Sequence, residues 1–219
     1  CIRDSRSDAL RATWGAAPDT MVLLHVGRIA PEKNLGAVVE TFRRLRQRGQ
    51  DVRLVFVGDG PSRSSIAAMA PEAIFCGMQG GDALAAHYAS GDVFLFPSLT
   101  ETFGNVTTEA LASGLAVSAC DCAAAGQLIR DGVNGHLVDP GRASADAFSS
   151  ASVQWLTASD PASAVWRPGS ALRRAARETA LSLSWDSVLA GLEHTLLAIV
   201  RGETPAPVPP VGAIGALKG

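Results

Sequence analysis

The sequence is poor in the features that would assign it to several common protein classes. Its 219 residues include 4 cysteines and one tyrosine, aromatic residues make up 5 %, and the formal net charge is −2. A charge this close to zero gives no electrostatic reason to expect binding to nucleic acid or to an anionic membrane surface. No apolar run reaches the roughly 18 residues that a membrane-spanning helix needs.

Cysteine and histidine are both scattered. The C-x-C spacing of Cys120 and Cys122 lacks the two-residue gap usual in metal or redox pairs. The histidines stand at 25, 87, 136 and 194, and no pair of them has the spacing of a zinc site. We therefore expect no metal site, and we expect the thiols to be reduced. Reduced thiols favour a cytoplasmic protein, with the inner face of the membrane as the alternative location.

The residues that are abundant predict an α/β fold. Hydrophobic residues make up 47 %, and short apolar runs alternate with helical patterns and tight turns. The expected strands are 21–27, 52–57, 73–76, 93–96, 115–119 and 136–138. Helices are expected at 35–48, from 62, at 81–90 with Asp82 as N-cap, from Gly104 to 113, and at 123–131, 143–157, 170–183 and 185–200 with Ser184 as N-cap. This pattern predicts a doubly wound, Rossmann-like parallel sheet of about six strands with helices on both faces.

The run ETFGNVTTE at 101–109 follows an expected strand and opens an expected helix. Glu101 should stay on the loop at the carboxyl end of the strand, where open parallel sheets bind ligands. Glu109 should lie in the first two turns of the helix. The free amides of Gly104, Asn105 and Val106 form an anion site, so the run offers amides for phosphate and carboxylates for sugar hydroxyls.

A second loop, GRIAPEKN at 27–34, brings Arg28 and Lys33 to the same edge of the sheet. Arg28 has the forked geometry that suits phosphate oxygens, and Lys33 is a compact charge. We expect the first and fourth strands to flank the topological switch, so the two loops should face each other. GDGP at 58–61 lacks the third glycine of a dinucleotide-binding fingerprint and reads as a tight turn, which weakens a dehydrogenase interpretation.

A series of motifs carries a family resemblance. In order they are GR at 27–28 with EKN at 32–34, GDGP at 58–61, YASGD at 88–92, FPS at 96–98, ETFGNVTTEA at 101–110, ASGL at 112–115, DGVNG at 131–135 and LSLSWD at 181–186. The chain resembles the carboxyl-terminal, donor-binding half of retaining GT-B glycosyltransferases of family four. It is most similar to GDP-mannose-dependent α-mannosyltransferases and sulfoquinovosyltransferase-like enzymes.

The resemblance implies a role for each site residue. Arg28 and Lys33 would hold the donor diphosphate, and Glu101 would bind hydroxyls of the donor sugar. Residues from Phe103 to Val106, together with Gly27, would approach sugar and phosphate. Glu109 would accept hydrogen bonds from the ribose hydroxyls. Gly77 and Met78 would flank the base. Such enzymes use a GDP- or UDP-linked sugar as substrate and need neither metal nor cofactor.

The resemblance also implies a division of the chain. Residues 1–20, which open on CIRDSRSD without an initiator methionine or a signal peptide, would be a linker and entry helix from a missing amino-terminal domain. Residues 21–202 would form the nucleotide-sugar-binding domain with its carboxyl-terminal helices, in which the region 149–169 departs from the family pattern. The proline-rich end, 203–219, would be a mobile tail.

Several functions stay open. The leading one is the donor half of an enzyme that transfers a hexose of mannose or glucose type to a lipid or glycan acceptor, which the missing domain would bind. Peripheral membrane association is expected of the full-length protein only. The alternatives are a non-catalytic nucleotide-sugar-binding module and, less favoured, a GT-B sugar epimerase, while the fragment alone is expected to be inactive.

Overall fold

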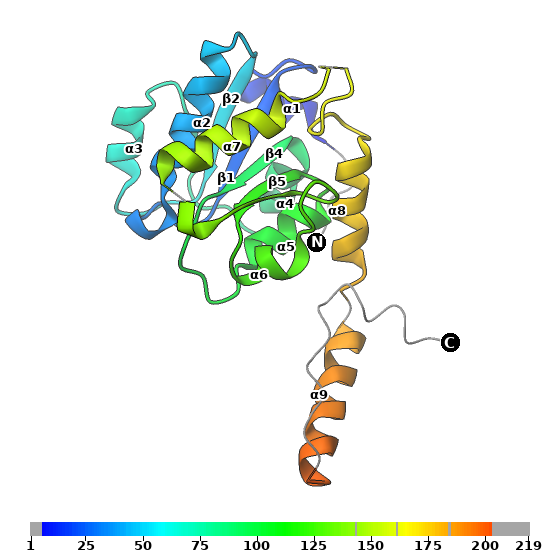
Figure 1. Cartoon of the computed structure of the whole chain (residues 1–219). Coiled ribbons are helices and arrows are strands. Elements are labelled where there is room, and N and C mark those ends of the chain that lie inside the picture. The colour runs from blue at the N-terminus through cyan, green and yellow to red at the C-terminus, as the bar shows by residue number, and fades with distance from the viewer. Residues whose placement is uncertain (1–5, 143, 161, 184, 203–219) are drawn as a thin grey trace.

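A six-stranded parallel sheet lies at the centre of the structure, a computed structural model that describes residues 6–142, 144–160, 162–183 and 185–202. The strands are β1 (Met21–Val26), β2 (Val52–Val57), β3 (Ile74–Phe75), β4 (Val93–Phe96), β5 (Ala116–Cys120) and β6 (His136–Val138). Their order is β3-β2-β1-β4-β5-β6, so the chain reverses its direction of winding between β1 and β4 (Figure 1). The predicted parallel sheet, its edge strand at 136–138 and the switch between the first and fourth strands are confirmed.

The central strands form because their residues are apolar, with His25 of β1 as the exception. Every residue of β1 and of β4 is buried, which is the pattern of strands covered on both faces. Leu23 of β1 pairs with Val93 of β4, so the two strands end side by side at the carboxyl edge of the sheet. That register places the loops after β1 and β4 next to each other.

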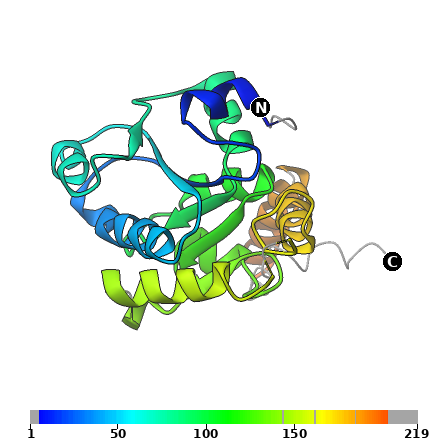
Figure 2. The same cartoon turned by 90° about the horizontal axis from the view of Figure 1, so that it is seen from above.

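Helices cover both faces of the sheet. The helical elements are α1 (Asp8–Thr13), η1 (Pro31–Lys33), α2 (Leu35–Gln47), α3 (Arg63–Met69), α4 (Gly81–Ser90), α5 (Asn105–Ala112), α6 (Ala123–Leu128), η2 (Pro140–Arg142), α7 (Ala145–Leu156), α8 (Ala171–Leu181) and α9 (Trp185–Val200). One core layer includes side chains of α2, α3 and α7, and the other includes side chains of α1, α4, α5 and α6. Figure 2 shows α2 and α7 side by side on their face of the sheet.

The boundaries follow the predicted ones closely, with one error at a helix start. Asp82 is not the N-cap of α4: Gly80 holds that position in an extended conformation, and Asp82 lies in the first turn. The next residue, Gly81, has φ 53°, a left-handed conformation that favours glycine, and the Asp82 charge still lies near the positive end of the helix dipole. The other expected cap, Ser184, and the tail 203–219 lie outside the described residues.

The turn after β2 packs directly on the turn after β1 through main-chain atoms. A Cβ at Gly58 would collide with the carbonyl oxygen of Gly27, and a Cβ at Gly60 would collide with that of Ile29. Gly58 also has φ 134°, a conformation that side chains disfavour. Glycine is required at both positions so that the two turns can touch.

A buried charge cluster lies at the opposite, amino edge of the sheet. Asp92, which precedes β4, is fully buried and accepts hydrogen bonds from the Arg11 guanidinium at 3.0 Å and from the Val22 amide at 2.9 Å. Arg6 lies at 3.1 Å and Arg173 of α8 at 3.4 Å from its other oxygen. The cluster therefore ties Arg6, α1 and α8 to the centre of the sheet.

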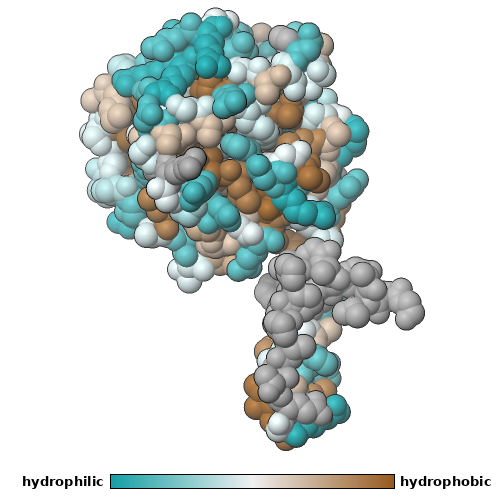
Figure 3. Space-filling view, in the orientation of Figure 1, coloured by the Kyte–Doolittle hydropathy of each residue, from teal (hydrophilic) through white to brown (hydrophobic). Residues whose placement is uncertain are grey.

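The last helix, α9, projects away from the body of the molecule (Figure 1). Apolar side chains are visible on its surface in Figure 3, and its exposed large hydrophobic residues include Leu189, Leu192, Leu196 and Ile199. None of the helices in the described residues is both long and apolar enough to cross a membrane.

Candidate functional site

The candidate site lies at the carboxyl edge of the sheet, where β1 and β4 end beside each other. Gly27 continues β1 with φ 141°, so the chain turns away from the sheet immediately after the strand. The short helix η1 then returns Lys33 toward the neighbouring loop. Asn34 ends η1 in a left-handed conformation that asparagine tolerates better than most residues.

The loop after β4 leads into the amino terminus of α5. Gly104 is the N-cap residue, with φ 87°. Because glycine has no side chain, no side-chain atom caps the start of the helix. The first amides of an α-helix have no acceptor within the helix, so Asn105 and Val106 present N–H groups to the loop side. Backbone donors and the helix dipole together make this helix start suited to an anion.

The two loops enclose a cavity of about 620 Å³. Its lining residues come from the ends of β1 and β4, from η1 and from the start of α5: Val26, Gly27, Arg28, Glu32, Lys33, Phe96, Glu101, Thr102, Phe103, Gly104, Asn105 and Val106. Within it, the Lys33 ammonium forms an ion pair with the Glu101 carboxylate. The side chains of this pair are only 16 % and 13 % exposed, and Lys33 also lies over the Phe96 ring, 5.6 Å from its centroid.

The other cation of the cavity is held differently. Arg28 lies 3.2 Å from Glu32, and the two side chains are 65 % and 40 % exposed. An exposed pair of this kind is weak, because water screens both charges. Arg28 can therefore turn toward an incoming anion at little cost.

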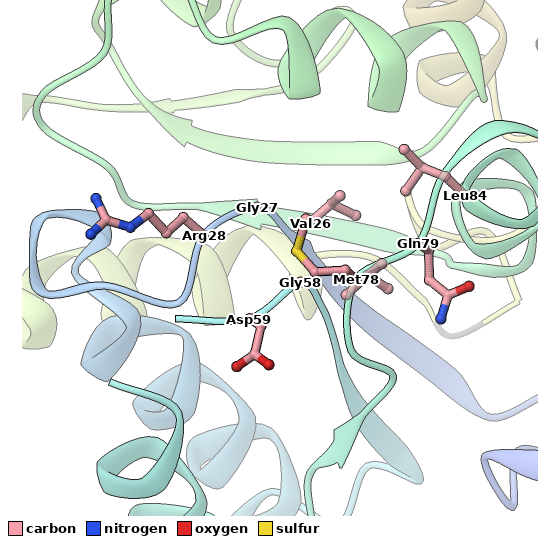
Figure 4. Close-up of a pocket in the computed structure, with 9 residues that line it drawn as sticks. Val26, Gly27, Arg28, Gly58, Asp59, Met78, Gln79 and Leu84 are labelled. Atoms are coloured by element: carbon pink, nitrogen blue, oxygen red, sulfur yellow. The ribbon is translucent and has the colours of Figure 1, made fainter. Parts of the chain in front are cut away.

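A second cavity, of about 460 Å³, adjoins the first and shares Val26, Gly27 and Arg28 with it. Its other lining residues are Val57, Gly58, Asp59, Met78, Gln79 and Leu84. Figure 4 shows Arg28 extending away from Met78 and Asp59, so its guanidinium lies apart from the apolar side chains of Met78 and Leu84. Met78 is 75 % exposed. The carbonyl of Gly77, the residue before it, accepts a hydrogen bond from the Gly58 amide at 2.8 Å.

Glu109 lies on α5 and is held by a buried tyrosine. The phenol of Tyr88, on α4, donates to Glu109 Oε2 at 2.8 Å, while Glu109 itself is exposed. Burial raises the pKa of the Tyr88 phenol, and the Glu109 carboxylate beside it raises the pKa further. The phenol therefore keeps its proton and remains a donor, which fixes the orientation of the carboxylate.

His25 of β1 is fully buried next to Val26, which lines both cavities. Its Nδ1 is 3.2 Å from the Leu95 carbonyl, so Nδ1 carries the proton, and Nε2 is buried without a partner among the described residues. Burial lowers the pKa of His25 to about 4, the Leu95 carbonyl opposes that shift, and Lys33 adds to it. The imidazole is therefore neutral near pH 7.

Thiols near the site are partly buried and protonated. Burial raises the pKa of Cys122, with the negative charge of Glu101 as a further cause, and its Sγ donates to the Ser98 carbonyl at 3.4 Å. In the described part of the chain there is no group of three or more His, Cys, Asp or Glu residues arranged to hold a metal ion.

The structure brings most of the predicted site residues together. Eight of them line the larger cavity (Gly27, Arg28, Lys33, Glu101, Phe103, Gly104, Asn105 and Val106), and Met78 lines the smaller one. Glu109 and Gly77 line neither cavity. The sequence interpretation missed Tyr88, although a buried tyrosine usually needs a partner for its hydroxyl and this chain has only one tyrosine.

Comparison with protein families gives a match over the sheet and the helices from α2 to α7. The model of the family described as Glycosyl transferases group 1 matches residues 20–158. That segment includes every strand and both loops of the candidate site.

Two curated proteins are similar in sequence. The GDP-mannose-dependent alpha-mannosyltransferase of Corynebacterium glutamicum is 42 % identical over 134 residues, which are 61 % of this chain and 31 % of the relative. The sulfoquinovosyl transferase SQD2 of Arabidopsis thaliana is 37 % identical over 129 residues, which are 57 % of this chain and 24 % of the relative. The matched part thus spans a third or less of either protein.

Among solved structures, the Anabaena protein HepE, in complex with UDP and glucose, is similar in fold. It is 21 % identical, the TM-score is 0.67, and the match covers 87 % of this chain and 51 % of HepE. At this level of identity the likeness shows the fold alone, which is that of GT-B glycosyltransferases.

Proposed function

This chain belongs to the Glycosyl transferases group 1 family, and on that premise we propose that it is the donor-binding half of a retaining hexosyltransferase. The donor is a nucleoside diphosphate sugar of mannose or glucose type, GDP- or UDP-linked, and the acceptor is a lipid or a glycan bound mainly outside this chain. The name of the Corynebacterium glutamicum relative favours GDP-mannose as the donor, whereas the Arabidopsis thaliana relative is named for a sulfoquinovosyl group.

One observation carries the proposal: a single cavity at the switch point combines two cations, an uncapped helix start and a carboxylate. The diphosphate is assigned to Arg28, Lys33 and the first amides of α5, which together offer both fixed dipoles and full charges. The sugar is assigned to Glu101, whose carboxylate accepts hydroxyl protons. Both assignments agree with the volume of about 620 Å³, which falls within the range of small-molecule sites.

The base is assigned to the adjoining cavity, and the ribose is assigned to Glu109, which lines neither cavity but lies on α5, whose start lines the larger one. The base lies against Met78 and the main chain beside Gly77, and Glu109 accepts from the ribose hydroxyls. Tyr88 orients Glu109 for this contact, because the phenol occupies one carboxylate oxygen and leaves the other oxygen open. Gly27 and Arg28 border both cavities and mark where ribose and diphosphate join.

In the reaction, the bond from the anomeric carbon to the diphosphate oxygen breaks and a bond to the acceptor oxygen forms on the same face of the sugar. The acceptor proton moves to the departing phosphate oxygen. Arg28 and Lys33 stabilise the negative charge that develops on that leaving group, which is electrostatic catalysis by groups already in place. Glu101 positions the sugar, and no metal ion is invoked because the two cations take the charge.

A second candidate function is nucleotide-sugar binding without catalysis by this chain alone. The observation that favours it is the length of the match, which spans 31 % and 24 % of the two curated relatives. The purified chain is then expected to bind the donor but to show no transfer, and measurable transfer by the chain would favour the catalytic reading instead.

The test of the proposal is calorimetric titration of the chain with GDP, UDP, GDP-mannose and UDP-glucose in the absence of added metal. Saturable binding of one nucleotide series is expected, and Glu109→Ala should abolish it. Glu193→Ala is the matched control, since Glu193 is also an exposed helical glutamate but lies on α9. Absence of binding in all four titrations, or equal loss in both variants, would contradict the proposal.

A further inference from the structure

The larger cavity contains two groups that neutralise each other when no ligand is present. Lys33 and Glu101 come from loops 68 residues apart in the sequence, yet they form an ion pair whose side chains are 16 % and 13 % exposed. In the proposed function these groups have different ligands: Lys33 takes the diphosphate and Glu101 takes the sugar. A ligand whose diphosphate draws the Lys33 ammonium fully toward itself therefore separates the pair.

The cost of separating the pair depends on which ligand arrives. A free nucleoside diphosphate draws Lys33 away and leaves Glu101 at 13 % exposure without its cation. A shielded carboxylate that loses its partner is unfavourable, because water cannot fully replace the lost interaction. An intact nucleotide sugar draws Lys33 away as well, but its hydroxyls donate to Glu101 and compensate for the loss.

We infer, on the basis of the proposed function, that the Lys33–Glu101 pair is a selectivity element that favours the intact nucleotide sugar over the free nucleoside diphosphate. The substrate satisfies both members of the pair, whereas the product of sugar transfer satisfies only one. The pair thereby weakens binding of the spent nucleotide in the site that has just released the sugar.

The Arg28–Glu32 pair provides a contrast within the same cavity. It also joins a cation and a carboxylate, but its side chains are 65 % and 40 % exposed. Water can solvate Glu32 after Arg28 leaves it, so this pair should discriminate little between the two ligands. Glu101→Gln and Glu32→Gln each remove one negative charge from one cavity, which makes them a matched comparison.

The experiment measures affinities of the 219-residue chain for GDP, GDP-mannose, UDP and UDP-glucose by calorimetry, in wild type and variants. Glu101→Gln is expected to tighten binding of the free nucleoside diphosphate about tenfold, since a charge-assisted contact no longer has to break. The ratio of sugar-nucleotide to free-nucleotide affinity should fall by at least that factor. Glu32→Gln should leave the ratio unchanged, and Glu101→Ala should shift it in the same direction as Glu101→Gln.

Lys33→Gln supplies the second half of the test. In that background there is no pair to break, so adding Glu101→Gln should no longer tighten binding of the free nucleotide. Weakened or unchanged free-nucleotide binding in Glu101→Gln overturns the inference while leaving the donor site standing, as does tightening that persists without Lys33. Failure of the wild type to bind any of the four nucleotides overturns the proposed function and the inference together.

Discussion

Asp92 should be one of the costliest carboxylates in this chain to neutralise. Its side chain is fully buried and accepts from the Arg11 guanidinium at 3.0 Å, the Val22 amide at 2.9 Å and the Arg6 guanidinium at 3.1 Å. The variant Asp92→Asn keeps the shape but removes the charge. Arg11, which is 1 % exposed, would then be buried without its counter-ion.

Breaking a buried ion pair from one side costs about 3–5 kcal/mol, because the remaining charge is uncompensated. For a chain of this size each kcal/mol lowers Tm by about 2–4 °C, so the melting temperature should fall by about 6–20 °C. Thermal unfolding followed by circular dichroism measures the change. The fall in Tm should be the same in the wild-type background and in a background with the candidate site mutated, since Asp92 lies at the opposite edge of the sheet.

Asp146→Asn is the control for this prediction. Asp146 also pairs with an arginine, Arg44, but its side chain is 78 % exposed. Such a pair contributes at most about 1 kcal/mol, so Tm should change by only a few degrees. Equal shifts in the two variants, or an Asp92→Asn protein as stable as wild type, would refute the reasoning from burial.

Two further predictions concern groups around the cavities. Tyr88→Phe should weaken nucleoside diphosphate binding by about three- to tenfold through loss of the hydrogen bond that orients Glu109, and titration with a 2′,3′-dideoxy analogue should show no such loss. His25 has a pKa of about 4 when folded and about 6.5 when unfolded, so the unfolded chain binds more protons in between and stability falls as pH drops from 6.5 to 4. The free energy of unfolding, measured with urea, falls between pH 7 and pH 4.5. In His25→Gln this fall should be smaller than in wild type by roughly 2–3 kcal/mol.

Much of the fold could be predicted because local and global signals agree in this sequence. The residues of β1 and β4 are apolar apart from His25, and each strand ends at a turn that contains a glycine or a proline. Two such strands can only be buried in the middle of a sheet, and the alternation with helices implies parallel pairing. From there the meeting of the two loops at the switch point follows, which is why the candidate site residues were found together.

The contacts within the site could not be predicted in the same way. The sequence placed Lys33 and Glu101 on facing loops, but it gave no reason for the two to pair, since each had been assigned a ligand. Tyr88 reaches Glu109 from another helix, a contact between positions 21 apart that no local spacing encodes. The start of α4 differs from the prediction for a related reason: aspartate is a good cap by propensity, but the left-handed backbone of Gly81 lets the helix begin before Asp82.

The contact between the two glycine turns limits how this site could be altered. Because Gly58 and Gly60 meet the turn after β1 through main-chain atoms, the floor there presents the same carbonyl and amide groups whatever side chains surround it. The walls of the smaller cavity are different, since Met78, Gln79 and Leu84 project into it from a neighbouring segment. If the proposed function holds, a laboratory search for altered base preference has Met78, Gln79 and Leu84 among the wall positions to randomise, over glycine turns that no side-chain library can reshape.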